Sequence, residues 1–388
     1  MKRILIVGMS TRAAAESAAR AGFQVTTIDG YADRDQHPSV RALSISRDFS
    51  SRPTASAIAR AARSLGSDAV VYLSPFENHP RAVSALASGR TLWGNSPDAL
   101  RRVRNPFELA DVLRRNGFRV PRLLSNDPND PNDPNDWLVK PFRSGGGNRI
   151  RPWHGGSIPR TCYLQERIDG WSGSLVFVAA AGACVPLGFS RQLAGDPLFG
   201  GNGYRYCGSI VAPVEPTLLQ KAVAVAECVT AEFGLTGLNG IDFVVARDGV
   251  PYPVEVNPRW SSSMEVAEKL LDATLFSMHV AACSTSDRPP EGASHDLEAR
   301  SPGARVMGKA IVYARQACSV GETAAWLNDP TVRDVPHSGE RFRPGQPVCT
   351  VLAAGDDARQ CHRLLAKRAD RIYAQLDVLV TRGASVVE

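Results

Sequence analysis

Two neighbouring segments near the middle of the chain carry side chains that could bind a metal ion. Asp242 lies in the apolar segment GLNGIDFVVA, and Glu255 and Asn257 lie in the segment VPYPVEVNP that follows. The dipeptide Asp248-Gly249 between them is typical of a β-hairpin turn. Residues two apart on a strand face the same side, so Glu255 and Asn257 share a face, and strand pairing can bring Asp242 to them.

Two carboxylates and an amide oxygen on one hairpin face suit a magnesium ion. Mg²⁺ prefers oxygen ligands and commonly takes few from the protein, with phosphate oxygens completing its octahedron. An acid that faces inward from strands rich in Val, Ile and Phe would be costly without a cation. The alternative is a solvated strand face with ordinary charges. We favour a site for Mg²⁺, or Mn²⁺ in its place, formed by Asp242, Glu255 and Asn257, with Arg259 on that face or at its rim.

A second feature is a glycine run after an apolar, strand-like segment. It comprises Lys140, then Pro-Phe-Arg, then Ser144, Gly145, Gly146 and Gly147. Ordering three successive glycines costs more chain entropy than a simple turn requires, so we expect something to approach the backbone closely there. In a Walker A loop the lysine follows the glycines, whereas here it precedes them. A lysine followed by a glycine-rich flap instead resembles loops that cover a triphosphate with backbone N–H groups.

The first hundred residues predict a parallel sheet. Residues 3–7 and 25–29 are strand-like on either side of a helix that runs to Gly22, and a strand at 68–73 and a helix at 80–88 follow. Alternation of strands and helices favours a Rossmann-like α/β domain, with ligand-facing loops at the carboxyl ends of its strands. Glu77 and Asn78 lie in such a loop. Glu77 could anchor the ammonium of an amino-acid substrate, or complement the dipole of the helix that follows.

Later segments predict a second, α+β region. A helical segment at 101–117 and a low-complexity run of Asn, Asp and Pro at 126–136, which we interpret as a surface loop, precede it. Strand-like segments then follow at 137–142, 161–168, 174–180, 183–190, 237–249 and 250–258, with a helix over 216–233. From about residue 300 come a strand, a strand–turn–strand unit and a closing helix near 356–377.

Composition excludes several classes of partner. Lys and Arg number 45 against 39 for Asp and Glu, without a basic block or a nucleic-acid motif, so we expect no nucleic-acid partner. The longest apolar stretch, residues 175–189, is shorter than the ~20 residues of a membrane span, so we expect no membrane partner. The eight cysteines form no CxxC pair, which favours reduced thiols in a cytoplasmic protein.

The order of these motifs resembles the ATP site of the ATP-grasp superfamily. Lys140 with the glycine run, then YLQERIDG, then GIDF and VEVNPR, are similar to its successive motifs. The segment at 300–350 is similar to the closing segment of the carboxylate–amine ligase branch related to biotin carboxylase. The resemblance implies a Rossmann-like pre-ATP-grasp domain at 1–100, an ATP-grasp domain of two α+β subdomains at 101–300, and a C-terminal segment at 301–388 that completes the fold.

The resemblance also implies roles for individual residues. Lys140 would contact the ATP phosphates or adenine, and residues 144–147 would form the flap. Gln165 to Ile168 would form the hinge, with backbone groups of Glu166 and Ile168 facing adenine. The hairpin oxygens would bind one or two Mg²⁺, and Arg259 would stabilise the transferring phosphoryl group. The implied activity is activation of a carboxylate as an acyl phosphate, followed by attack of an amine.

Three positions depart from the family pattern. Trp171 and Ser172 occupy the place of an acid that often holds the ribose, and Arg102 or Arg104 stands in for an upstream lysine. The sequence after NPR does not match that of bicarbonate-using members, which argues against bicarbonate and biotin as substrates. The substrate contacts that we predict are Glu77, Asn78, Arg191, Gln192, Tyr206 and Ser262.

We therefore expect small-molecule carboxylate and amine substrates, from amino-acid metabolism or from biosynthesis of a one-carbon cofactor of the pterin or furan type. The sequence does not specify the oligomeric state, and a homodimer is a reasonable expectation for such a family. Two alternatives stay open. A non-catalytic ATP-binding sensor is disfavoured by the complete set of Mg²⁺ ligands. A nicotinamide-dependent oxidoreductase is disfavoured by the single Gly8, where the dinucleotide fingerprint has three glycines.

Overall fold

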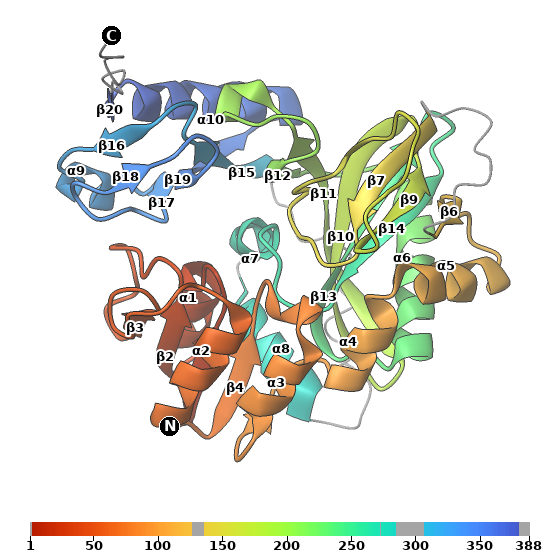
Figure 1. Cartoon of the computed structure of the whole chain (residues 1–388), viewed down its shortest axis with the longest axis horizontal. Coiled ribbons are helices and arrows are strands. Elements are labelled where there is room, and N and C mark those ends of the chain that lie inside the picture. Colours follow the sequence, from red (N-terminus) through yellow and green to blue (C-terminus); the bar gives the residue numbers. More distant parts are fainter. Residues whose placement is uncertain (1, 126–135, 272, 285–305, 380–388) are drawn as a thin grey trace, which may run out of the picture.

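The start of the chain forms the expected parallel sheet. The computed structural model describes residues 2–125, 136–271, 273–284 and 306–379. In it, five parallel strands lie in the order β3-β2-β1-β4-β5: β1 (Arg3–Val7), β2 (Gln24–Asp29), β3 (Arg41–Ser44), β4 (Ala69–Tyr72) and β5 (Thr91–Leu92). Helix α1 (Arg12–Arg20) follows β1, α2 (Ala55–Ala61) follows β3, and α3 (Pro80–Ala87) follows β4 (Figure 1). The sequence pattern does not predict β3, whose four residues RALS have no strong apolar alternation.

The single helix predicted over 101–117 is wrong, because the chain forms two helices there. α4 (Pro97–Val103) and α5 (Pro106–Arg115) are separated by Arg104 and Asn105. Pro106 disfavours helical geometry in the residue before it, and Asn105 is extended, with ψ 110°. The Asn105 side-chain oxygen accepts a hydrogen bond from the Phe107 N–H and so caps α5. The break leaves Arg104 at the junction of the two helices.

A four-stranded antiparallel sheet follows, in the order β6-β9-β7-β8. Its strands are β6 (Leu123–Leu124), β7 (Trp137–Pro141), β8 (Arg151–Pro152) and β9 (Cys162–Glu166). Trp137, Trp153 and Leu164 belong to its own small core. Apart from Asp136, the low-complexity run interpreted as a surface loop lies outside the described residues.

The largest sheet is antiparallel and joins the middle of the chain to its C-terminal part. Its order is β14-β13-β10-β11-β12-β15-β19-β17. The central strands are β10 (Gly170–Ala180), β11 (Ala183–Ala194), β12 (Tyr206–Val211), β13 (Gly237–Ala246) and β14 (Pro251–Asn257), and the C-terminal ones are β15 (Val306–Tyr313), β17 (Val332–Arg333) and β19 (Pro347–Gly355). Because β12 pairs with β15, the C-terminal segment extends the same sheet.

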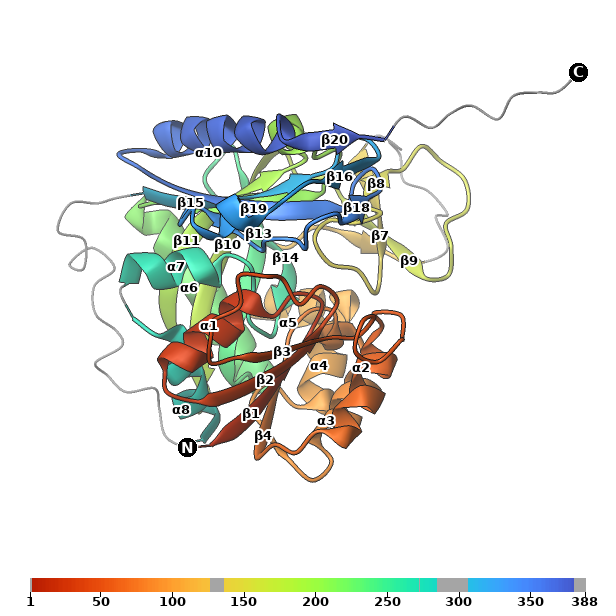
Figure 2. The ribbon, with the colours of Figure 1, turned by 90° about the vertical axis from the view of Figure 1, so that its left-hand side faces the viewer.

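Helices cover this sheet and tie it to the first domain. α6 (Pro216–Phe233) packs on β10 and β11, and α10 (Ala358–Tyr373) packs on β15 and β19. α7 (Met264–Leu271) lies between the N-terminal sheet and the C-terminal strands in both views (Figures 1 and 2). α8 (Leu275–Ser284) contacts α1, β10 and β13, and one hydrophobic core includes Ile4 of β1, Val176 of β10 and Phe276 of α8.

The smaller elements complete the C-terminal part. They are β16 (Cys318–Val320), α9 (Ala324–Leu327), β18 (Arg341–Phe342) and β20 (Leu376–Val378), with a three-stranded sheet in the order β18-β16-β20. The predicted combination of α/β and α+β architecture is confirmed. The boundaries at 100/101 and 300/301 stay predictions. No helix within the described residues has both the length and the apolarity to cross a membrane.

Candidate active site

A cavity of about 460 Å³ lies between the four-stranded sheet, the eight-stranded sheet and the first loop of the chain. Most of the side chains and backbone segments predicted from sequence as site residues line it: Lys140, Gly146, Gly147, Gln165, Glu166, Ile168, Ser172, Gln192, Tyr206, Asp242, Glu255, Asn257, Arg259 and Ser262. Five predicted residues do not: Glu77, Asn78, Ser144, Gly145 and Arg191. The fold therefore gathers most of the motifs into one space. Gly145 belongs to the glycine loop but not to the lining, and the contacts of the other four residues explain their positions.

The hairpin of β13 and β14 brings the predicted oxygen ligands together. Asp242 lies directly opposite Glu255, and Gly240 lies opposite Asn257. Directly opposed residues share a sheet face, so both carboxylates point to the same side. The Asn257 side-chain nitrogen donates to Asp242 Oδ2 at 3.0 Å. A bulge between Asp242 and Phe243 shifts the register beyond this point.

The charges of this pair suit a cation. Gln192 donates to Asp242 Oδ1 at 2.9 Å, and Asp242 forms no ion pair among the described residues. Burial, followed by the charge of Glu255, raises the pKa of Asp242 to about 6. Within the described residues no group of three or more His, Cys, Asp or Glu side chains could hold a metal ion. Two carboxylates and an amide oxygen fit Mg²⁺ only if other oxygens, such as those of phosphate, complete its shell.

Arg259 is held at the rim of the hairpin by a buried acid. Its Nη2 donates to Asn257 Oδ1 at 3.1 Å and forms an ion pair with Glu77 Oε1 at 2.8 Å. Burial alone would raise the pKa of Glu77, but the Arg259 guanidinium outweighs it and the pKa is lowered. The prediction that Glu77 anchors a substrate does not fit this geometry, because its side chain is fully buried and paired with Arg259.

Arg104 connects the hairpin to the glycine loop. Its Nη1 donates to Glu255 and to the Val256 carbonyl, and its Nη2 donates to the Asn78 side chain and the Ser144 carbonyl. Asn78 in turn donates to the Ser144 carbonyl at 3.2 Å. Asn78 and Ser144 therefore act in the support of the loop and are not in the cavity lining. Of the two arginines proposed to replace the upstream lysine, Arg104 reaches Glu255.

Arg102 and Arg191 point elsewhere. Arg102 forms an ion pair with Glu108 at 2.9 Å, with 41% of its own side chain exposed. Arg191 is exposed, and its guanidinium lies 5.6 Å from the centre of the Trp171 ring. Neighbours on a strand face opposite sides, so Gln192 rather than Arg191 faces the cavity. The prediction of a substrate contact at Arg191 is not supported by this arrangement.

Lys140 and the segment that runs from the end of β9 toward β10 form the opposite wall of the cavity. The Lys140 ammonium is buried and donates to Gln165 Oε1 at 3.0 Å and to the Val254 carbonyl at 3.3 Å. Gln165, Glu166 and Ile168 line the cavity, and so does Arg167, which lies within the same predicted hinge segment. Lys140 thus ties the four-stranded sheet to β14 beside the hairpin acids.

The glycine run packs against the chain itself. Gly146 and Gly147 have φ of +62° and +69°. A Cβ on Gly147 would lie 1.7 Å from the Tyr204 carbonyl oxygen, whereas one on Gly146 would have no neighbour closer than 4.0 Å. The Gly146 carbonyl accepts a hydrogen bond from the Tyr206 N–H at 2.9 Å. The close approach expected from the sequence is present at Gly147, where the approaching group is the backbone before β12.

Comparison with known proteins agrees with this arrangement of motifs. Residues 103–263 match the family model of the ATP-grasp domain. The chain contains an ATP-grasp domain. The match begins at the end of α4 and includes Lys140, the glycine loop, the hinge segment and the hairpin acids. The resemblance to the ATP-grasp superfamily noted in the sequence is confirmed.

Two solved structures share the fold over almost the whole chain. An L-amino acid ligase from Bacillus licheniformis has a TM-score of 0.68 at 16% identity and covers 98% of this chain and 99% of its own. A biotin carboxylase from Campylobacter jejuni has a TM-score of 0.70 at 14% identity, covering 97% of this chain and 91% of its own. An uncharacterized protein of Methanocaldococcus jannaschii is 21% identical over 372 residues, which are 90% of this chain and 88% of that protein.

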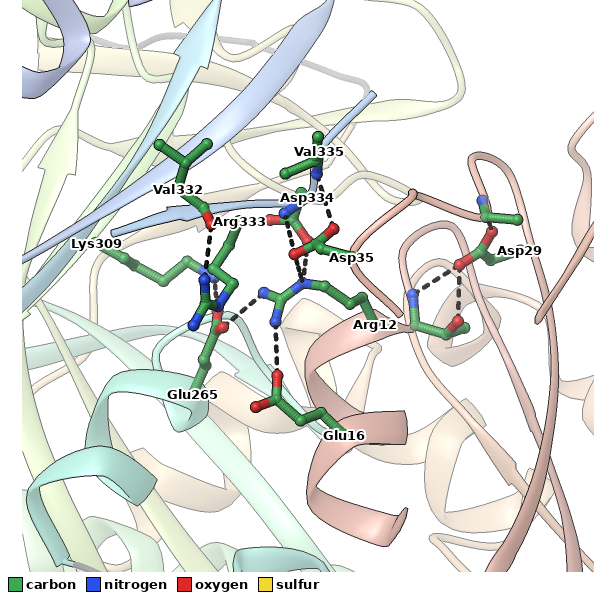
Figure 3. A network of polar contacts seen from close by, with 12 residues as sticks. Arg12, Glu16, Asp29, Asp35, Glu265, Lys309, Val332, Arg333, Asp334 and Val335 are labelled. Carbon is green, nitrogen blue, oxygen red and sulfur yellow. Dashed lines mark hydrogen bonds and ion pairs between the residues drawn. The ribbon is translucent and has the colours of Figure 1, made fainter. Parts of the chain in front are cut away.

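The far wall of the ATP-grasp cavity is a buried charge network that was missed in the sequence (Figure 3). Arg12 of α1 has a fully buried side chain and forms ion pairs with four acids, which are Glu16, Asp35, Glu265 and Asp334. Lys309 of β15 also pairs with Glu265. Arg12, Lys309 and Asp334 line the cavity. These residues come from α1, the loop after β2, α7, β15 and the loop after β17, so no local sequence signal could group them.

Within this network, the neighbouring cations keep the Glu265 carboxylate in its charged form. Burial alone would raise the pKa of Glu265, but the Arg12 and Lys309 charges hold it far below its usual range. The pKa of Asp334 is likewise lowered, because the charges of Arg12 and Lys309 outweigh the effect of burial. The network therefore joins the N-terminal domain, α7 and the C-terminal strands through charged groups that pair with one another.

Proposed function

We propose that this chain is an ATP-dependent ligase that activates a carboxylate as an acyl phosphate and joins it to an amine, with release of ADP and phosphate. The observation that carries the proposal is the placement of Asp242 opposite Glu255, in one cavity with Lys140, Arg259 and the glycine loop. Asp242 has no ion-pair partner among the described residues, which leaves a carboxylate in the cavity lining that could bind a cation.

The hairpin end of the cavity would hold the reacting phosphate. In this proposal Asp242, Glu255 and Asn257 hold Mg²⁺, which when bound would screen the repulsion between the substrate carboxylate and the γ-phosphate. Arg259 places a positive charge beside the same oxygens, and its pairing with Glu77 fixes the guanidinium before substrate arrives. Such preorganised charge is commonly the largest contribution to catalysis. Arg104 would orient Glu255 and support the glycine loop.

The opposite wall would hold the nucleotide. Gln165 to Ile168 form the proposed adenine hinge, and Ser172 of β10 lies in the same lining, where the ribose would be placed. The Lys140 ammonium is already held by Gln165 and by the Val254 carbonyl. It would therefore lose little side-chain conformational freedom when it contacts phosphate or adenine. Gly146 and Gly147 close the loop onto β12 and expose backbone rather than side chain to the cavity.

The finer proposal is an amino-acid substrate, or a substrate from biosynthesis of a pterin- or furan-type one-carbon cofactor. Support comes from the L-amino acid ligase, whose chain is matched over nearly its full length. The polar residues Gln192, Tyr206 and Ser262 line the cavity beside the hairpin and are the side chains we propose to contact the substrate. A bicarbonate substrate stays disfavoured by the residues that follow NPR.

A nicotinamide cofactor would need a free acid at the end of β2 to bind its ribose, and Asp29 at that position is not free. Asp29 accepts hydrogen bonds from the Thr11 hydroxyl at 2.7 Å and from the backbone N–H groups of Thr11, Tyr31 and Ala32. Its side chain is fully buried. A ribose hydroxyl would have to displace these contacts, so Asp29 is better described as a group that holds the first two loops together.

The test is ADP release by the full chain with Mg²⁺-ATP and pools of amino acids, amines and cofactor precursors. Substrate-dependent ADP formation should fall at least about 100-fold in Glu255→Gln. The exposed Glu227 on α6 offers a matched control, and Glu227→Gln should keep the wild-type rate. Tight ATP binding without turnover in any pool would favour the sensor alternative. Absence of ATP binding would overturn the proposal.

A further inference from the structure

A second space of about 180 Å³, here called the side chamber, adjoins the main cavity. Its lining shares Met9, Ser10, Ile311, Asp334 and Thr350 with that cavity, so the two spaces are contiguous on the Arg12 side. The rest of the side chamber is formed by the loop after β2 and by the C-terminal segment, including Tyr31, Asp33, Glu340 and Phe342. None of the roles proposed above uses it.

All charged side chains that line the side chamber are acidic. Asp33, Asp334 and Glu340 contribute carboxylates, and its described lining contains no Lys, Arg or His. Asp33 is 8% exposed, and its Oδ2 is buried without a hydrogen-bond partner among the described residues. A buried carboxylate oxygen without a donor is costly, and this position therefore calls for a hydrogen-bond donor or a cation.

The neighbouring cations are already engaged by other acids. Arg12 is shared by Glu16, Asp35, Glu265 and Asp334, and Lys309 pairs with Glu265. Two cations thus face four carboxylates before Asp33 is counted. Arg34, the next residue in sequence, donates to Glu322 instead. Burial, reinforced by the charge of Asp334, raises the pKa of Asp33 well above its ordinary value.

The shape and chemistry of the side chamber fit an organic cation better than a metal ion. The described acids do not form a group of three or more that could hold a metal. Tyr31 and Phe342 supply aromatic surface, which attracts organic cations, and Pro347 and Val348 add apolar surface. An ammonium group can donate to several carboxylates that are too far apart to ligate one metal ion.

We propose that the side chamber binds a non-reacting ammonium group of the substrate, at the end remote from the bond that is formed. This inference rests on the proposed ligase function, because the reacting end of the same molecule would lie in the main cavity beside Arg259 and Asp242. The substrate class is then a compound with a second ammonium group, such as a diamine or a basic amino acid. Asp33 and Glu340 are the residues that select for it.

The test is calorimetric titration of the full chain with matched probes that differ in the terminal ammonium. The pairs are L-lysine with L-norleucine, L-ornithine with L-norvaline, and cadaverine with pentylamine. At least one ammonium-bearing probe should bind at least about tenfold tighter than its partner. Asp33→Asn should reduce that ratio to near one, whereas Asp111→Asn, an exposed acid on α5, should leave it unchanged. Equal affinities within all three pairs would overturn the assignment.

A second variant and a nucleotide titration keep the result interpretable. Asp33→Asn is nearly isosteric, and Glu340→Gln provides an independent loss of charge on the other side of the chamber, which should also lower the ratio. Retained discrimination in both variants would overturn the assignment. Mg²⁺-ATP binding is measured on the same samples. If Mg²⁺-ATP binds and the probes are not discriminated, only the side chamber assignment fails; if Mg²⁺-ATP does not bind, the ligase proposal fails, and the probe ratios still decide the chamber's preference.

Discussion

At the hairpin end of the cavity each buried arginine meets one carboxylate, whereas at the Arg12 end a single arginine is shared by four. Arg104 pairs with Glu255 and Arg259 pairs with Glu77, while Asp242 has no ion pair among the described residues and its pKa is raised to about 6. At the other end, Arg12 and Lys309 hold the pKa of Glu265 far below its usual range.

The difference separates two uses of buried charge. At the hairpin end, the Asp242 carboxylate has no ion pair among the described residues, so a bound cation could neutralise it. The Arg12 network pairs Glu16, Asp35, Glu265 and Asp334 with cations of the chain itself. It connects α1, α7, β15 and the loop after β17, so its main effect is on assembly of the fold. The following four predictions test this division, from the largest expected effect to the smallest.

Replacement of Arg12 should give the largest loss of stability. Arg12→Met leaves Asp334, Asp35 and Glu16 without their guanidinium and Glu265 with Lys309 alone, and unpaired buried charges of this kind cost about 3–5 kcal/mol. The measurement is urea denaturation followed by tryptophan fluorescence. Arg101→Met, an exposed arginine paired with Asp98 on α4, is the control and should change stability by less than about 1 kcal/mol. A small effect at Arg12 would show that the network does not hold the parts together.

Removal of the Asp242 charge should act on turnover and leave the fold intact. Asp242→Asn keeps the size of the side chain and removes a carboxylate that burial disfavours, at the cost of one of the two hydrogen bonds that Asp242 accepts from Gln192 and Asn257. The urea midpoint should therefore stay close to that of the wild type. ADP formation should fall by about 100-fold or more. A variant that unfolds early but keeps its turnover per folded molecule would reverse the roles assigned to the two ends.

The two glycines of the loop should differ although both have positive φ. Gly147→Ala combines the strained conformation with a clash against Tyr204, and we expect ATP affinity to fall by at least about tenfold. Gly146→Ala carries similar strain of roughly 1–2 kcal/mol without the clash and should weaken binding less. Equal losses in the two variants, measured by nucleotide titration, would show that backbone strain alone controls this loop.

Low pH should remove the contribution of the Arg12 network to folding stability. The pKa values of Glu265 and Asp334 are lowered in the folded state, so their stabilisation is present at neutral pH and is lost as pH falls below their ordinary values of 4.5 and 3.8. The stability difference between wild type and Arg12→Met should therefore shrink between pH 5 and the acid limit of folding. Urea midpoints of both proteins across that range measure it, and a constant difference would contradict the assignment.

Sequence information was sufficient for the hairpin because its residues are local. Asp242, Glu255 and Asn257 lie on two strands joined by a short turn, and the turn fixes which residues oppose each other. The break at Asn105 was also readable in principle, since Pro106 restricts the residue before it, yet an unbroken helix was predicted. That break is what directs Arg104 to Glu255, so a local error concealed a supporting residue of the site.

The Arg12 network and the side chamber could not be predicted from the sequence. Arg12, Lys309 and Asp334 meet only because β15 enters the sheet beside β12 and α1 packs against α8. The same reason applies to Glu77, which looked like a free acid in a loop and is instead the buried partner of Arg259. Pairings across hundreds of residues depend on sheet order, which alternation of apolar residues does not specify.

The pairing of β15 with β12 also determines when the cavity can form during synthesis of the chain. A ribosome adds roughly 5–20 residues per second, and Arg12 and its partner Asp334 are 322 residues apart. Arg12 is therefore synthesised on the order of 15–65 seconds before the acid that it will meet. Until residues 306–313 emerge, one edge of β12 has no partner strand. The N-terminal domain can fold early, but the cavity gains its far wall only after Lys309 and Asp334 have been synthesised.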